Sequence, residues 1–162
     1  QVTRVATSPN GIHFTAQPDI FSRSYLRAFT NDSHTYALVM PGQVYRFADG
    51  QYPLKEGPLL FNKDIRHSAL WKKGDSLHVL WSQAGDVPER ILMSTIDLSV
   101  DWREWRETES IDVLYPERPW EGAGAPPTGT SINCATRRYF RKMIETICST
   151  QSPARVVWAS QR

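Results

Sequence analysis

Six charged or imidazole side chains stand where strand-like segments of this sequence begin or are joined: Arg27, Arg66, His67, Glu89, Arg90 and Glu121. Guanidinium and imidazole groups donate hydrogen bonds to hydroxyls or carboxylates, and a glutamic acid can donate a proton. A charged group at the start of a buried strand needs a partner, because its unpaired burial is costly. We therefore expect these residues either to bind a ligand or to pair with one another.

Two interpretations follow for these six residues. In the structural one, Glu89 pairs with Arg27 or Arg66 in a buried network that fixes how the strands align. In the functional one, the two arginines, His67 and Arg90 bind a substrate, and Glu89 or Glu121 donates a proton to it. Both interpretations require the residues to meet at one edge of the fold.

The stretch from Ile65 to Trp105 predicts the elements that would hold them. It divides at turn-forming residues into four short segments: Arg66–Trp71, Leu77–Ser82, Arg90–Ile96 and Trp102–Arg106. Strand-length apolar runs bounded by Gly, Asp, Pro and Ser indicate a four-stranded antiparallel sheet. Leu77, Val79 and Trp81 share one face of their strand, while Leu80 makes the other face apolar. This sheet is therefore expected to pack between two neighbours.

The same pattern occurs about forty residues earlier, which is a spacing typical of propeller blades. Its predicted strands are Tyr25–Phe29, Tyr36–Met40, Val44–Phe47 and Leu54–Leu60. Further upstream, Val2–Ala6, a turn at Pro9–Gly11, and Ile12–Phe14 predict half of another blade. The chain is thus predicted to be all-β, a partial propeller over residues 1–123, with a half blade at 1–21 and blades at 24–61 and 64–115. A β-sandwich of unrelated hairpins is the alternative.

Strand reversal sorts the loops of such blades into two rims. The entry to the first strand and the loop between the second and third strands share one rim, since every hairpin reverses the chain. All six candidate residues fall on that rim. The opposite rim receives three polar turns, at Asn31–Ser33, Lys73–Asp75 and Asp97–Ser99, which read as ordinary solvated turns.

Composition separates the chain into a mildly acidic body and a basic tail. Of its 162 residues 40% are hydrophobic, which supports a packed core, and the net charge of +2 is too small to indicate nucleic-acid binding. Both cysteines, Cys134 and Cys148, lie in the tail, so the body offers no cysteine metal site. We expect no cofactor, no metal and no membrane partner. The sequence starts at Gln1 without a signal peptide, which favours a cytoplasmic fragment.

Two segments carry a family resemblance: Ala6–Phe14 and Ser94–Trp102. In each, a strand containing Ser leads through an Asn or Asp turn to an aromatic residue. They resemble the recurring element of the five-bladed propeller glycoside hydrolases, which include arabinanases, β-xylosidases and fructan-cleaving enzymes. The resemblance implies a carbohydrate substrate on the rim described above, bound by Arg27, Arg66, His67 and Arg90. Trp102 and Trp105 are expected to be structural, closing the outer edge of the blade.

The resemblance also sets out a catalytic requirement. Glycosidic cleavage needs one carboxylic acid and one opposed carboxylate, and Glu89 and Glu121 are the candidates for the acid. The family's Arg-Asp-Pro sequence does not occur, and His67 stands at the matching strand entry. The base would lie upstream of Gln1, so the chain is expected to be inactive by itself. The alternatives are a non-catalytic carbohydrate-binding propeller and an interaction propeller.

Residues 124–162 do not continue the blade pattern. Read literally, Tyr139–Cys148 could form a short basic helix, with apolar residues at helical spacing, and the remainder an irregular tail. Shifting the codons by one frame permits Arg-Asp-Pro-Ala-Ile-Phe from Cys134 and Leu-Leu-Tyr-Ser from Ile147. That order is the missing blade in family form, so we interpret this tail as out of frame.

Overall fold

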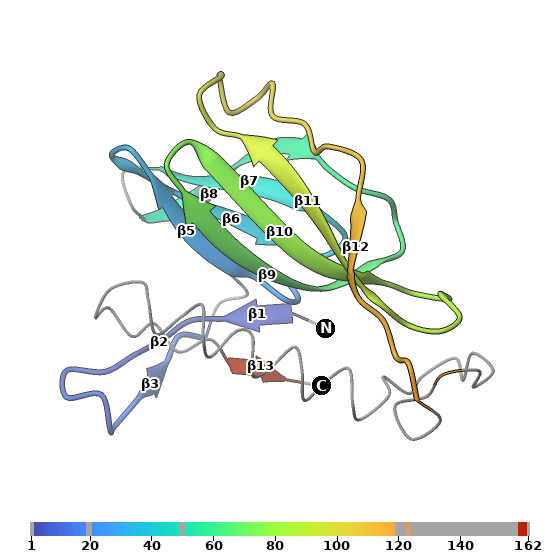
Figure 1. Ribbon diagram of the computed structural model, residues 1–162. Helices are drawn as coiled ribbons and strands as arrows, with labels where there is room; N and C mark the ends of the chain where they lie inside the picture. Colours follow the sequence, from blue (N-terminus) through green and yellow to red (C-terminus); the bar gives the residue numbers. More distant parts are fainter. Residues whose placement is uncertain (1, 19–20, 49–50, 119–122, 124–158, 162) are drawn as a thin grey trace.

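The computed structural model describes residues 2–18, 21–48, 51–118, 123 and 159–161, and over these residues the chain is all-β. Its strands form four antiparallel sheets, two of them with four strands each (Figure 1). This confirms the all-β prediction. The predicted helical or irregular tail lies almost entirely outside the described residues.

The first large sheet is a simple meander in the order β5-β6-β7-β8. Its strands are β5 Arg27–Asn31, β6 His34–Val39, β7 Gln43–Ala48 and β8 Gln51–Leu59. All four occur where the sequence pattern predicted them. One face of the sheet buries Leu26, Ala37, Val39 and Phe47, and the other face contributes to a larger core.

The second large sheet repeats this meander in the order β12-β11-β10-β9. Its strands are β9 Ile65–Lys73, β10 Ser76–Gln83, β11 Ile91–Asp97 and β12 Ile111–Leu114. Leu77, Val79 and Trp81 enter the large core, while Leu80 enters a separate cluster on the other face. The prediction that β10 is buried on both faces is therefore confirmed.

The fourth strand of this sheet was wrongly predicted at Trp102–Arg106. That segment forms turns, because the Asp101 carboxylate accepts the backbone N–H of Arg103 at 2.9 Å and the Asp101 carbonyl accepts that of Glu104 at 2.8 Å. The turns bury both indoles, with Trp102 5% and Trp105 1% exposed. The structural role expected for the two tryptophans is confirmed.

The two large sheets pack face to face through one hydrophobic core, with the second sheet in front of the first in Figure 1. The first strands of the two sheets, β5 and β9, are in contact. Tyr36 of the first sheet lies 4.8 Å from the Trp105 ring and 6.0 Å from the Trp102 ring. Arg46 and Arg103 lie over Trp102, at 4.9 and 5.2 Å from its ring. The segment between β11 and β12 therefore fastens one sheet to the other.

Short strands lie below these sheets in Figure 1. They are β1 Val2–Arg4, β2 Ala6–Thr7, β3 Thr15–Ala16, β4 Ser22–Arg23 and β13 Ala159–Gln161, with β1 between β13 and β4, and β2 paired with β3. The strand predicted at Ile12–Phe14 is wrong. The Asn10 carboxamide oxygen accepts the backbone N–H groups of Ile12 and His13, both at 3.0 Å, and so prolongs the turn.

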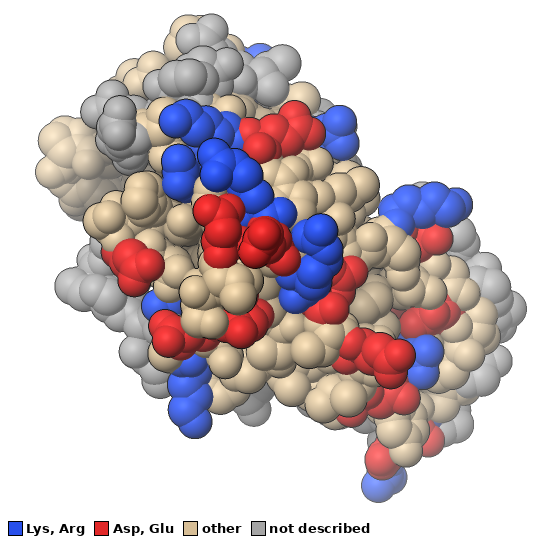
Figure 2. Space-filling view, turned by 90° about the horizontal axis from the view of Figure 1, so that it is seen from above, with Lys and Arg blue, Asp and Glu red and all other residues tan. Residues whose placement is uncertain are grey.

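The three polar turns predicted for the opposite rim lie at the upper end of the two sheets in Figure 1. Figure 2 views the molecule from above, toward this end, and shows basic and acidic side chains next to one another among the described residues. Neither sign of charge dominates that face.

Candidate functional site

One end of the second large sheet holds four of the six candidate residues: Arg66 and His67 at the start of β9, and Glu89 and Arg90 just before β11. Because the sheet is a meander, β9 and β11 start at this end of the sheet, while β10 and β12 finish there. The hydrogen bond from the Ala84 N–H to the Asp64 carbonyl, at 2.8 Å, joins the loop after β10 to the residue before β9. We call this end of the second sheet the rim; it lies at the lower right of the sheet in Figure 1.

A small cavity lies at the rim between the two large sheets. Tyr25, Met40 and Gly42 line it from the first sheet, and Ile65, Arg66, His67 and Ser68 from the second. Its volume is about 10 Å³, which is room for about one water molecule. The structure therefore brings Arg66 and His67 together, but a ligand larger than water would have to lie outside this cavity.

His67 owes its position to a β-bulge. Ala69 pairs with Leu80 and Arg66 with Ser82, so two residues of β9 stand opposite one of β10. The backbone of His67 is left-handed, with φ of 31°, and Tyr25 has φ of 59°. The two rings meet edge to face with centroids 5.0 Å apart. Such bulges turn a side chain away from the regular alternation of a strand, and non-glycine residues in this region are uncommon.

Arg27 joins the two large sheets. Its Nε donates to the Ser68 carbonyl of β9 at 2.9 Å, and its Nη1 donates to the Leu26 carbonyl at 3.1 Å. These two hydrogen bonds of Arg27 therefore go to backbone carbonyl groups, one of them across to the second sheet. No ion pair joins Glu89 to Arg27 or Arg66 in the described part of the chain.

Neither of the two predicted acids, Glu89 and Glu121, has a described position in a pocket. Glu89 is half-buried in the loop between β10 and β11, and it lines neither the inter-sheet cavity nor the pocket described next. Glu121 lies outside the described residues. Among the described residues, no predicted acid lines the cavity that holds Arg66 and His67.

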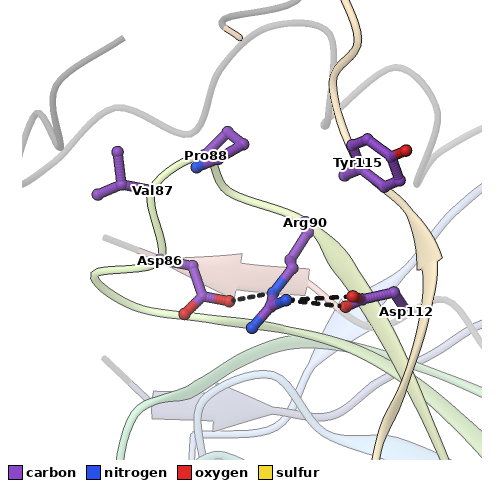
Figure 3. Close-up of a pocket in the computed structure, with 6 residues that line it drawn as sticks. All are labelled: Asp86, Val87, Pro88, Arg90, Asp112 and Tyr115. Carbon is purple, nitrogen blue, oxygen red and sulfur yellow. Dashed lines mark hydrogen bonds and ion pairs between the residues drawn. The ribbon is translucent and has the colours of Figure 1, made fainter. Parts of the chain in front are cut away.

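Arg90 lines a second and larger pocket at the same rim, of about 340 Å³ (Figure 3). We call it the Arg90 pocket; its described lining is Asp86, Val87, Pro88, Arg90, Asp112 and Tyr115. The Nε of Arg90 lies 3.1 Å from Asp86 Oδ2, and its Nη1 lies 3.0 Å from Asp112 Oδ1. The guanidinium thus occupies the space between the two carboxylates (Figure 3).

The charge of Arg90 is reinforced by these contacts. The hydrogen bond to Asp86 is the main cause that raises the pKa of Arg90; partial burial lowers it, and the charges of Asp86 and Asp112 raise it further. Around this trio, Val87 is 53% and Tyr115 55% exposed. The pocket therefore offers hydrogen-bond donors and acceptors beside an accessible aromatic ring.

Sequence reasoning identified Arg90 but missed Asp86, Asp112 and Tyr115. Asp86 is one of the turn-forming residues that separate the predicted strands, but an Asp four residues before an Arg in a rim loop was a usable signal. Asp112 and Tyr115 could not be found because the fourth strand was predicted too early. Among the described residues, no group of three His, Cys, Asp or Glu side chains is arranged to hold a metal ion.

The sequence of this chain is similar to that of a viral protein. The chain is 31% identical over 142 residues to an uncharacterized protein, R118, of Acanthamoeba polyphaga mimivirus, and the match covers 77% of this chain. The chain spans 40% of the length of that relative. No protein-family model matches the chain, and no solved structure matches it. In the part of the chain that the structure describes, no helix is long and apolar enough to cross a membrane.

Proposed function

We propose that this chain is part of a carbohydrate-active β-propeller of the glycoside hydrolase type and that its rim binds a neutral sugar. Two successive four-stranded meanders, packed face to face with their first strands in contact, support the propeller. The resemblance carried by Ala6–Phe14 and Ser94–Trp102 supports the carbohydrate ligand.

The Arg90 pocket is the observation that carries this proposal. Two carboxylates around one guanidinium leave the trio with a net negative charge, which disfavours an anionic ligand. Sugar hydroxyls both donate and accept hydrogen bonds, so they suit a site that holds acceptors and donors together. The exposed Tyr115 ring can pack against the apolar C–H face of a sugar ring.

The second candidate function is carbohydrate binding without cleavage, and the position of Arg90 between two carboxylates favours it. Glycosidic cleavage requires an acid and a carboxylate facing each other across the bond. In the Arg90 pocket the space between the two carboxylates is filled by the arginine. A catalytic pair would have to include Glu89, Glu121 or other residues outside this pocket.

The test measures binding and turnover with the whole chain. On an array of neutral oligosaccharides the chain is expected to bind at least one sugar, and it is expected to release no p-nitrophenol from aryl glycosides. Asp112→Asn should weaken the binding about tenfold, since it removes a charged acceptor from the pocket. Asp101→Asn is the matched control, because Asp101 is similarly exposed (53% against 51%) and also pairs with one arginine.

Three results would revise the proposal. Equal weakening by both substitutions would show that sugar does not bind at the Arg90 pocket. Failure to bind any neutral sugar would refute the carbohydrate function. Turnover of an aryl glycoside would replace the binding function with a catalytic one.

A further inference from the structure

A row of hydrogen-bonded side chains continues along the rim from the Arg90 pocket toward the start of β9. The Nδ2 of Asn62 donates to Gln83 Oε1 at 2.8 Å, and the Nε2 of Gln83 donates to Asp86 Oδ1 at 3.3 Å. Asp86 in turn accepts from Arg90, which reaches Asp112. We call these five residues the polar row.

The polar row runs across the strand ends at the rim of the second large sheet. Asn62 precedes β9, Gln83 ends β10, Arg90 precedes β11, and Asp112 belongs to β12. Neighbouring strands are about 4.8 Å apart, so the row crosses three strand spacings, or roughly 14 Å. This length exceeds that of a single sugar ring.

Some amide hydrogens of the polar row are not used in hydrogen bonds within the row. A carboxamide nitrogen carries two hydrogens, and Asn62 and Gln83 each use one of them within the row. Asn62 is exposed and Gln83 is half-buried, so the second hydrogen of each amide can reach a ligand. Amides that offer both donors and acceptors suit hydroxyl groups better than apolar or charged ligands.

We propose that the ligand of this rim is a linear neutral oligosaccharide that lies along the polar row. One sugar ring stacks on Tyr115 in the Arg90 pocket, and the following rings bind over Gln83 and Asn62. This inference rests on the proposed carbohydrate function and adds the length of the ligand to it. It makes Gln83 and Asn62 determinants of chain-length preference.

Calorimetric titration of the whole chain with mono-, di- and trisaccharides of the cello, manno and arabino series tests the inference. In at least one series the trisaccharide is expected to bind about tenfold more tightly than the monosaccharide. Gln83→Met should remove most of that gain. Asn62→Asp should also reduce the gain, since it removes the donating N–H but keeps the oxygen that accepts the Asp64 N–H at 2.9 Å.

Lys63→Met is the matched control, because Lys63 adjoins Asn62 and its side chain is 89% exposed outside the polar row. It should change neither affinity nor length dependence. Equal affinity for mono- and trisaccharides would overturn the inference while leaving the proposed function intact. A gain in affinity that survives both Gln83→Met and Asn62→Asp would also overturn it, and no binding by any sugar would overturn both proposals.

Discussion

Single carboxylates accept hydrogen bonds that shape the loops at both ends of the second large sheet. Asp97 ends β11 on the side opposite to the Arg90 pocket. Its Oδ1 accepts the Ser99 hydroxyl at 2.7 Å and the Ser99 backbone N–H at 2.9 Å. The hydroxyl, followed by the backbone N–H, lowers the pKa of Asp97 below its ordinary value of 3.8.

Ser99→Ala is expected to raise the pKa of Asp97 toward that ordinary value, because the larger of the two causes is removed. A lowered pKa contributes stability above the ordinary value, and this stability is lost as pH falls through the folded-state pKa. The variant should therefore lose less stability than the wild type on acidification over that range. Carbon-detected NMR titration measures the pKa directly.

Ser33→Ala, in the turn between β5 and β6, is the control and should leave the pKa of Asp97 unchanged. An Asp97 pKa that is the same in wild type and Ser99→Ala would contradict the assigned cause.

The candidate site could be predicted only in part, for reasons that act on particular residues. The sequence singles out Arg27, Arg66, His67 and Arg90 because charge at a strand start is visible in a sequence. It does not single out their partners, since Arg27 bonds to a backbone carbonyl and Arg90 reaches Asp112, 22 residues further along the chain. The first contact depends on the packing of β5 against β9 and the second on the pairing of β11 with β12, and no local pattern specifies either.

At the scale of elements, the segment between β11 and β12 packs the second large sheet against the first. It carries Trp102 and Trp105 across to the first sheet, where Gly57 of β8 lies against the Trp102 ring. A Cβ at position 57 would collide with Trp102 Cζ3 and lie 2.9 Å from its Cε3. Glycine at this position therefore allows the indole to approach the strand.

Gly57→Ala is expected to lower the free energy of unfolding by about 1–3 kcal/mol, the usual cost of overpacking a core. Denaturant unfolding followed by circular dichroism measures the loss. Trp102→Leu in the same chain should recover part of it, because the smaller side chain removes the collision. Strictly additive losses in the double variant would show that the two residues do not share this contact.

The same segment explains why the fold was predicted well in one respect and badly in another. Seven of the eight strands of the two large sheets follow apolar runs bounded by turn residues, and these were located from the sequence. The eighth was misplaced because Trp102 and Trp105 look like strand residues. Their burial depends on tertiary contacts, because the indoles pack on Tyr36 of the first large sheet. The Asp101 carboxylate closes a turn around Trp102.

At the scale of the whole molecule, the two large sheets act as one unit. A single core holds residues of both, and Arg27 adds a hydrogen bond between their first strands. On the second sheet, the hydrogen-bonded side chains of the polar row run from Asn62 to Asp112. We propose that sugar binds to the polar row at Arg90.

Side-chain NMR of the arginine Nε–H groups tests that claim most directly, with the oligosaccharide series described above as ligands. Arg90 and Arg103 each pair with aspartate, but only Arg90 lines the pocket. The Arg90 resonance is expected to shift saturably with added sugar, while the Arg103 resonance stays in place. An Arg90 resonance that does not move at saturating sugar would contradict the claim, as would equal shifts of both arginines.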